Sequence, residues 1–366
     1  MNNLIKKKQI PNLTPIRFIL ALLVVLYHIP QFCENRGFPF YNDLAIFHKG
    51  IEAVYVFFSL SGFLIIKQLF IEKKSKGTIR LKAFFLRRVL RIFPLYYLIL
   101  GFGFLYYHLI LPYFGFDYEN TYDLFSGILL SITFFPNIFS KYAPGGILEI
   151  LWSIGIEEQF YLFIAPLFFL LPLKRILLFL GLFTSIYFFI FFSESFLFLK
   201  KYDMLFFYFS FSGLLAIILN HKYFQIFIQK TRYLIFSLFI LYFTTSLFKN
   251  NLNVVYYQLF SMLLFGLTIS VLAQKPIKFL ENKTMNYLGK ISYGIYMYHA
   301  IMIQFVGLLY LKGISKLNLN GTLDILIITF LVISLTILTS HLSYKYYESY
   351  FLKLKHRKNI KRQLDK

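Results

Sequence analysis

The residues of this chain that could do chemistry begin with an arginine and a histidine inside its first long apolar run. Arg17 and His28 lie within residues 11–31, a stretch long enough to cross a bilayer. An ionisable side chain near the centre of a span costs about 2.5–3.5 kcal/mol, so both residues need an explanation. They are eleven residues apart, which places them on nearly the same helical face and about 16 Å apart along the axis. We expect this helix to line a cavity with two polar stations, where a neutral imidazole can act as a base.

Arginines gather where a later apolar run begins. Arg88 and Arg91 are three residues apart and Arg87 lies four before Arg91, so Arg91 shares a helical face with each of them at the membrane boundary. A guanidinium group suits bidentate binding of phosphate. Arginines at this boundary also serve as plain anchors on the cytoplasmic side, and the sequence leaves both interpretations open for Arg88 and Arg91. Tyr96, which follows them, joins this candidate set.

Small residues interrupt the bulky aromatic run at residues 50–71. Ser59, Ser61 and Gly62 lie close together there. Small side chains at such spacing usually allow two helices to pack closely. Close packing is therefore the simpler interpretation, and a polar lining at Ser61 is the alternative.

Two adjacent carboxylates, Glu157 and Glu158, lie near the start of a run that opens with the only tryptophan, Trp152. Ser153, Glu157 and Tyr161 fall at positions i, i+4 and i+8 and share one helical face, so Glu158 points elsewhere. Carboxylates within a span are costly unless they line a wet cavity or pair with arginine. We expect a role in lining a site, with a structural Glu–Arg clamp as the alternative.

A further histidine lies on a polar face near residue 290. Ser292, Tyr296 and His299 follow Gly289 at helical spacing. His299 could serve as a ligand or proton relay, although a histidine bonded to a neighbouring tyrosine or to the backbone is the commoner arrangement. Glu348 lies among basic residues after the last run, where an ordinary surface ion pair is expected.

The bulk composition defines the fold class. The 366 residues are 58% hydrophobic and 15% charged, whereas soluble domains are about one quarter charged. Repeated long apolar runs predict an all-α, polytopic membrane protein with no soluble domain. The net charge of +22 reflects topology rather than nucleic-acid binding, since basic residues gather in short loops on one side. The one cysteine, Cys33, and the scattered histidines offer no metal-ligand spacing, and Walker and GxSxG motifs are absent.

Hydropathy predicts ten spans separated by short loops. They cover residues 12–32, 50–71, 84–111, 152–172, 175–192, 203–219, 231–248, 255–274, 290–311 and 323–347. With a retained first helix and a cytoplasmic N-terminus, 29 of the 38 lysines and arginines lie inside and eight outside, so both termini are expected in the cytoplasm. Leu124–Phe139 is apolar but short and contains Pro136, which predicts a re-entrant segment. The domains are then a cytoplasmic tail (1–11), a transmembrane domain (12–350) and a basic cytoplasmic tail (351–366).

Six motifs occur together in an order that identifies a family. They are Arg17 and His28 spaced as R-x10-H, FFSLSGF (57–63), RRVLRIFPLY (87–96), WSIGIEEQFYL (152–162), GKISYGIYMYH (289–299) and YYE (346–348). In these motifs the chain resembles the membrane-bound acyltransferase family 3, which includes bacterial O-acetyltransferases of lipopolysaccharide, capsule, exopolysaccharide and peptidoglycan. The resemblance covers residues 12–350, and the ten helices usual in the family agree with the hydropathy count.

The resemblance implies an enzyme of the bacterial inner membrane that moves an acyl group, most often acetyl, from cytoplasmic acyl-CoA to a hydroxyl of a surface glycan or glycolipid. His28 would be the base or would carry the acyl group itself, and Arg17 would stabilise the thioester oxyanion or position the donor. Arg88 and Arg91 would hold the donor phosphates.

The remaining site residues have supporting roles in this scheme. Glu157 or Glu158 would orient a cationic partner or the sugar. Tyr96 and Ser61 are assigned to the donor side, and the residues expected to support substrate or structure are Trp152, Ser153, Tyr161, Ser292, Tyr296, His299 and Glu348. Some family members carry an extracytoplasmic hydrolase-like domain after the last helix, which this chain is expected to lack.

Three rival functions share some of these features. A transporter or flippase of lipid-linked sugars also needs polar stations inside a helical bundle, although the sequence shows no matching halves with broken helices. A regulator that acylates a small molecule or a protein would use the same catalytic face. A non-catalytic scaffold would tolerate replacement of Arg17 and His28, which is hard to reconcile with the cost of burying them.

Overall fold

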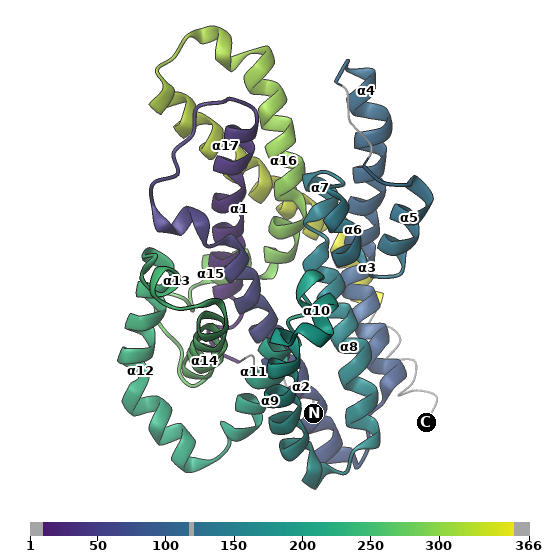
Figure 1. The fold of residues 1–366 in the computed structure, drawn as a ribbon, viewed down its shortest axis with the longest axis vertical. Helices are drawn as coiled ribbons and strands as arrows, with labels where there is room; N and C mark the ends of the chain where they lie inside the picture. Colours follow the sequence, from purple (N-terminus) through teal and green to yellow (C-terminus); the bar gives the residue numbers. More distant parts are fainter. Residues whose placement is uncertain (1–9, 117–120, 355–366) are drawn as a thin grey trace, which may run out of the picture.

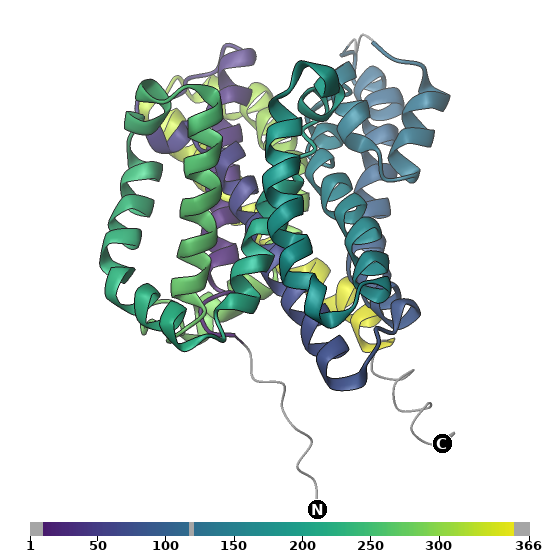
Figure 2. The ribbon, with the colours of Figure 1, turned by 60° about the horizontal axis from the view of Figure 1, so that its bottom comes forward.

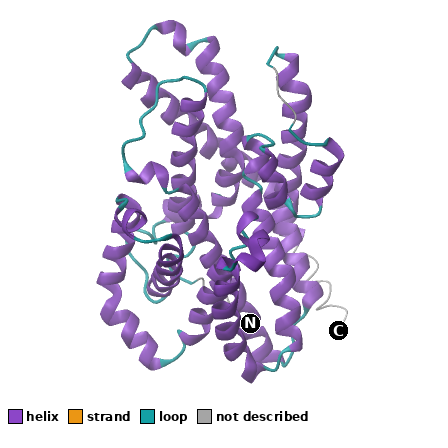
Figure 3. Ribbon diagram, in the orientation of Figure 1, coloured by secondary structure: helices purple, strands orange, loops and turns teal. Residues whose placement is uncertain are grey.

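The computed structural model describes residues 10–116 and 121–354, which form helices joined by short loops, with no strand among them (Figure 3). The long helices are α1 (Ile16–Asn35), α2 (Gly50–Lys76), α3 (Leu81–Leu105), α8 (Trp152–Leu170), α9 (Ile176–Phe192), α11 (Phe206–Ile218), α12 (Lys222–Thr244), α14 (Val254–Leu272), α16 (Ser292–Lys312) and α17 (Gly321–Ser343). The short ones are α4 (Leu111–Tyr113), α5 (Leu124–Ile132), α6 (Pro136–Phe139), α7 (Gly146–Glu149), α10 (Leu197–Lys201), α13 (Leu247–Asn251) and α15 (Lys283–Lys290). Single 3-10 turns include η1 (Ala45–His48) and η3 (Ser140–Tyr142), and π-helical turns η2 (Tyr106–Ile110) and η7 (Tyr344–Glu348) extend α3 and α17.

The span count confirms the predicted fold class. Within the described residues, nine helices are long and apolar enough to cross a membrane, and a bent pair, Glu194–Lys201 with Phe206–Ile218, brings the count to ten. The seventh predicted span, residues 231–248, differs most in its bounds, since α12 covers Lys222–Thr244. The sixth, residues 203–219, differs by a bend. Its helix begins only at Phe206, because the chain turns by 83° just before it and Asp203 adopts a positive φ of 52°.

The centre of the bundle is the contact between α2 and α11 (Figure 1). A Cβ added to Gly62 would lie 2.1 Å from the carbonyl oxygen of Phe209, and one added to Gly213 would lie 2.1 Å from Ile66. The two helices therefore approach as closely as only glycine permits. Around this pair, α1 packs against α2 and α16, and α16 packs against α17. Close packing is thus the role of Gly62.

The described chain begins and ends at the same end of the bundle, as the purple and yellow ribbons at the bottom of Figure 2 show. We call this the near end and the opposite one the far end. An even number of crossings requires this arrangement. The segment Leu124–Phe139 forms two short helices, α5 and α6, with Phe134 at a positive φ of 63° between them, so it turns back instead of crossing. The predicted tails, 1–11 and 351–366, fall largely outside the described residues.

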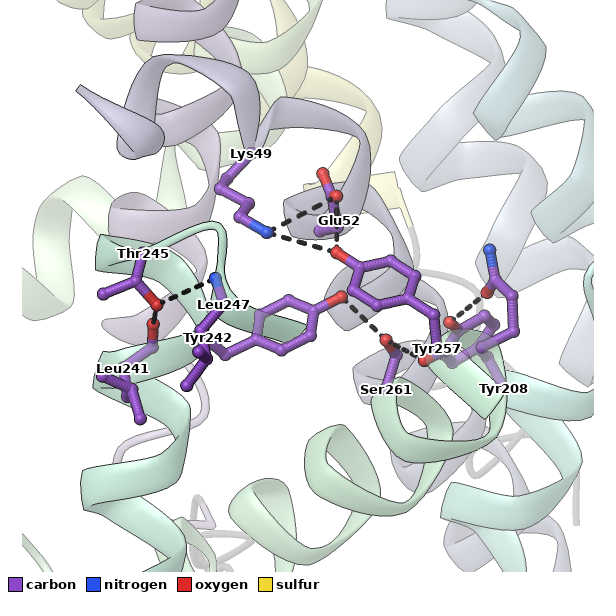
Figure 4. A network of polar contacts seen from close by, with 10 residues as sticks. Lys49, Glu52, Tyr208, Leu241, Tyr242, Thr245, Leu247, Tyr257 and Ser261 are labelled. Carbon is purple, nitrogen blue, oxygen red and sulfur yellow. Dashed lines mark hydrogen bonds and ion pairs between the residues drawn. The ribbon is translucent and has the colours of Figure 1, made fainter. Parts of the chain in front are cut away.

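A buried cluster at the far end fixes the start of α2 (Figure 4). The Lys49 ammonium donates to the Tyr257 hydroxyl (3.2 Å) and lies 3.8 Å from a Glu52 carboxylate oxygen, to which Tyr257 also donates (2.8 Å). It lies 4.6 Å from the ring centroid of Tyr242, whose hydroxyl shares a hydrogen bond with Ser261 (2.7 Å). We call these five residues the lysine–tyrosine cluster. Lys49 lies outside the membrane-spanning helices, and burial lowers its pKa.

Candidate active site

A cavity of about 340 Å³ lies at the far end, between the end of α1, the start of α2, α7 and α16. Its lining includes Tyr27, His28, Gln31, Gly50, Tyr55, Ser140, Lys141, Glu149, Trp152, Asp203 and Tyr296. Most of these side chains are polar or aromatic, although the helices that carry them are long apolar spans. A pocket with aromatic walls and convergent polar groups suits a small hydroxylated ligand.

His28 lies in this cavity and faces a second histidine. The ring centroids of His28 and His299 are 5.2 Å apart, with 30° between the ring planes. Nδ1 of His299 hydrogen-bonds to the backbone carbonyl of Tyr296, which makes Nδ1 the protonated nitrogen and leaves Nε2 as an acceptor. His299 is wholly buried, and its Nε2 has no hydrogen-bond partner among the residues that the structure describes. The structure therefore brings together two histidines that lie on different helices.

Tyr296 connects the histidine pair to the opposite wall. Its hydroxyl hydrogen-bonds to Ser153 (2.8 Å) and donates to the backbone carbonyl of Ile150 (2.8 Å). These contacts join α16 to the start of α8, where Trp152 lines the cavity with its ring edge-on to Phe58, 5.8 Å between centroids. The predicted residues Trp152, Ser153 and Tyr296 thus belong to one wall beside His28.

The sequence analysis did not single out three charged residues of the cavity. Lys141 and Asp203 form an ion pair of 2.6 Å at the rim, and Glu149 from α7 lines the wall. Their separation in the chain hides them, since Lys141 and Asp203 are 62 positions apart and neither lies in a span motif. The Pro–Gly–Gly turn before α7 was the nearest available signal for Glu149.

Arg17 does not line this cavity but lies in a charged group nearer the near end. Its charge interacts with Arg91, Glu157, Tyr161 and Arg88, and Arg91 in turn interacts with Glu348. The Arg88 guanidinium lies 5.4 Å from the Tyr161 ring centroid. We call Arg17, Arg88, Arg91, Glu157 and Glu158 the arginine cluster. It joins residues of α1, α3 and α8 that the sequence singled out separately.

The arginine cluster is not closed by ion pairs. Both Glu157 carboxylate oxygens accept hydrogen bonds from hydroxyls, one from Ser61 (3.0 Å) and the other from Tyr161 (2.9 Å). Within residues 10–116 and 121–354, no carboxylate lies within 4.0 Å of the nitrogens of Arg17, Arg88 or Arg91. The predicted alternative of a structural Glu–Arg clamp is therefore not what the structure shows, and Ser61 has the polar role that was the alternative to packing.

Two buried atoms of the arginine cluster are left without hydrogen bonds. Arg88 Nε and one Glu158 oxygen have no partner in the part of the chain that the structure describes. Arg91 nevertheless remains exposed, although charges from three other segments surround it. Guanidinium groups that lack carboxylate partners can bind phosphate.

Three predicted residues lie apart from these groups. Tyr96 is wholly buried and donates to the carbonyl of Ser131 (2.7 Å), so we assign it to packing against α5 and not to a donor site. Ser292 donates to the carbonyl of Gly289 (3.0 Å) in the turn between α15 and α16. Glu348 was expected in a surface ion pair, and this is wrong. It is 8% exposed and accepts from Ser343 (3.2 Å), because the π-turn η7 rotates it into the bundle.

A bundle of apolar helices with buried charged groups defines a multi-pass membrane protein. The model of the family described as "acyltransferase domain" matches residues 10–341, and the chain belongs to this family. The resemblance to this family is thereby confirmed over a range that contains five of the six motifs, since YYE (346–348) lies beyond residue 341, and the protein is an acyltransferase.

Several curated proteins are similar to this chain. A protein of Acidianus two-tailed virus named as an acetyltransferase is 27% identical over 311 residues, 82% of this chain and 86% of its own length. One named as an O-acetyltransferase from Staphylococcus aureus strain COL is 26% identical over 95% of this chain, which spans 58% of that protein. The peptidoglycan O-acetyltransferase OatA of Listeria monocytogenes is 28% identical over 177 residues, 46% of this chain and 25% of its own length. No solved structure matches.

Proposed function

We propose that the protein is an O-acetyltransferase that moves acetyl from acyl-CoA at the near end to a hydroxyl of a cell-surface glycan held in the far-end cavity. The near end is then the cytoplasmic side of the inner membrane, with both termini in the cytoplasm. The proposal rests on one observation above all, a histidine inside a membrane span that lines a polar and aromatic cavity. A base of this kind is what alcohol acylation requires.

In the proposed reaction, His28 moves one proton from the acceptor hydroxyl to the CoA sulfur. His28 accepts the proton of the acceptor hydroxyl as its oxygen attacks the thioester carbonyl, and the C–S bond breaks to release CoA as a thiolate. The imidazolium then returns the proton to the sulfur, so a neutral histidine is regenerated. In the alternative order His28 first carries the acetyl group and then transfers it to the hydroxyl. Trp152 provides an aromatic wall for the sugar ring in either order.

The arginine cluster is suited to the donor. Arg88 and Arg91 would bind the phosphates of CoA, and Arg17 on α1 would position the pantetheine arm of the donor. Glu157, held by Ser61 and Tyr161, would offset part of the repulsion between Arg17 and Arg91. These roles extend the family assignment to residues of this chain.

Labelled acetyl transfer tests the proposal. Membrane vesicles that contain the protein are given acetyl-CoA with a radiolabelled acetyl group, and the label is followed into membrane glycan. Replacing His28 by Asn should lower the rate about 10²–10⁴-fold, because a general base contributes that much. His221→Asn, the same change at an exposed histidine, is the matched control. Transfer at the wild-type rate by His28→Asn would reject the assignment, and glycan movement without acetylation would favour the rival transporter.

A further inference from the structure

A second hollow lies beside the cavity, on the other side of α7. It is a groove of about 210 Å³ between α3, with its π-turn η2, and α16. Its lining is Phe102, Tyr106, Ile110, Ile147, Ile301, Met302, Gln304, Phe305 and Leu308. Figure 1 shows α7 between α16 and α3, where both neighbours contact it. Apart from Gln304 and the Tyr106 hydroxyl, every lining side chain is apolar, so the groove suits a hydrocarbon chain and not a sugar.

The groove and the cavity share their walls. In α7, Ile147 faces the groove, whereas its neighbours Gly146 and Glu149 line the cavity. In α16, Tyr296 lines the cavity and Ile301 the groove, and His299 between them contacts His28. One ligand could therefore occupy both spaces, with its apolar part in the groove and its polar part beside His28.

A cation lies beside the polar groups of the groove. Arg36, directly after α1, donates to the side-chain oxygen of Gln304 (2.9 Å), which also accepts from Tyr106 (3.4 Å). The Arg36 guanidinium lies on the Phe32 ring, 4.5 Å from its centroid, and forms no ion pair with any carboxylate that the structure describes. An exposed arginine at the end of an apolar groove is complementary to a lipid phosphate.

We propose that the groove holds the hydrocarbon chain of a phosphate-linked lipid, that Arg36 binds its phosphate, and that this lipid carries the acceptor hydroxyl into the cavity. The acceptor is then modified while it is anchored in the membrane. This inference rests on the proposed function, since it names the class of acceptor for the same site. It also explains why the catalytic histidine lies within a membrane span, because a lipid-anchored substrate enters from the bilayer.

Lipid binding tests this inference separately from catalysis. The purified protein in detergent is titrated with a C55 polyprenyl phosphate, with the C55 alcohol and with phosphatidylglycerol, and the complexes are counted by native mass spectrometry. The phosphate form should bind about tenfold more tightly than the alcohol, as one charge-assisted hydrogen bond provides. Arg36→Gln should remove that preference. Equal binding of phosphatidylglycerol would show an ordinary membrane lipid in the groove and would overturn the inference.

A groove-filling variant locates the site. Ile301→Trp should weaken binding of the polyprenyl phosphate about tenfold or more, because the added ring occupies the groove. Leu309→Trp is the control, since Leu309 lies on the same helix and is 41% exposed outside the groove. If Ile301→Trp does not fold, Leu308→Trp at the other end of the groove replaces it. Equal affinity of the groove and control variants would contradict the proposal, whereas His28→Asn should bind the lipid normally and lose only transfer.

Discussion

Two clusters of charged residues in this bundle differ in how far their polar atoms have hydrogen-bond partners. In the lysine–tyrosine cluster, Lys49, Glu52 and Tyr257 contact one another at 2.8–3.8 Å (Figure 4). In the arginine cluster, Arg88 Nε and one Glu158 oxygen lack hydrogen bonds to the residues that the structure describes. A closed group contributes to stability when intact and has nothing left for a ligand. A cluster with unpaired buried atoms has a desolvation cost, and a bound ligand that hydrogen-bonds to those atoms can offset it.

We expect this difference to separate charges that serve structure from charges that serve function. Burial alone does not distinguish the two clusters, since Lys49 is 2% exposed and Glu158 is 5% exposed. What distinguishes the two clusters is whether their buried polar atoms have hydrogen-bond partners. Changes in the arginine cluster should therefore reduce catalysis more than stability, and changes in the lysine–tyrosine cluster should do the reverse.

Arg17 gives the largest expected effect on catalysis after His28. Replacing it by Gln should lower kcat about 10²-fold, as misplacement of a bound substrate does, with little change in melting temperature. Arg17→Lys should recover part of the rate because it restores the positive charge but not the planar donor geometry. Steady-state acetyl transfer and thermal melting are measured on the same samples. A large fall in melting temperature with an unchanged kcat per folded molecule would mean that Arg17 serves the stability of the bundle and not catalysis.

Lys49 and Glu52 should show strong coupling in stability. Lys49→Met or Glu52→Leu alone should each cost about 3–5 kcal/mol of the free energy of unfolding, because each leaves a buried partner behind. The double variant should lie close to the wild type, since no buried charge remains. Unfolding in mixed micelles provides the free energies. As a contrast, the half-exposed pair Lys141–Asp203 should contribute at most about 1 kcal/mol. Additive losses at Lys49 and Glu52 would mean that the cluster is not a closed unit.

The smallest expected effect is a pH dependence that arises from Lys49. Burial lowers its pKa in the folded protein, with Lys249 acting in the same direction and Glu52 opposing it. Between the lowered pKa and the ordinary value of 10.5, the unfolded chain binds a proton that the folded chain has released. Stability should therefore rise with pH in this window, by at most about 1.4 kcal/mol per pH unit, and level off above it.

Melting temperatures between about pH 8 and pH 10 check this dependence, with Lys49→Met as the comparison. The wild type should gain stability relative to the variant as the pH rises. A relative loss would mean that partners stabilise the charged form more than burial disfavours it.

The sequence predicted the parts of the site that lie within one helix. The face of Ser153, Glu157 and Tyr161 follows from periodicity, because a helix fixes which residues share a side, and the ten spans follow from the length of the apolar runs. Arg17 and His28 share a helix, but only His28 lines the cavity that was expected to hold both. Contacts between distant segments did not follow. Tyr257 meets Glu52 across 205 positions, and no local pattern marks a pair so far apart.

Charges at span ends were the least predictable feature. Lys73, near the end of α2, is 7% exposed and donates to the carbonyls of Phe168 and Phe169 at the end of α8. Such capping satisfies carbonyls that a helix cannot pair by itself. Glu348 was misplaced for a similar reason, since the π-turn that turns it inward has no signature in the sequence.

The central claim is that the arginine cluster binds the donor and the cavity performs transfer. Equilibrium binding of acetyl-CoA tests this claim most directly. Isothermal titration compares His28→Asn, the double variant Arg88→Gln/Arg91→Gln, and the control Arg87→Gln, whose side chain lies 3.7 Å from Glu72 instead. Two lost charge-assisted contacts should weaken binding about 10²-fold or more in the double variant, whereas His28→Asn and Arg87→Gln should bind acetyl-CoA like the wild type. Normal binding by the double variant, or loss of binding in His28→Asn, would contradict the account.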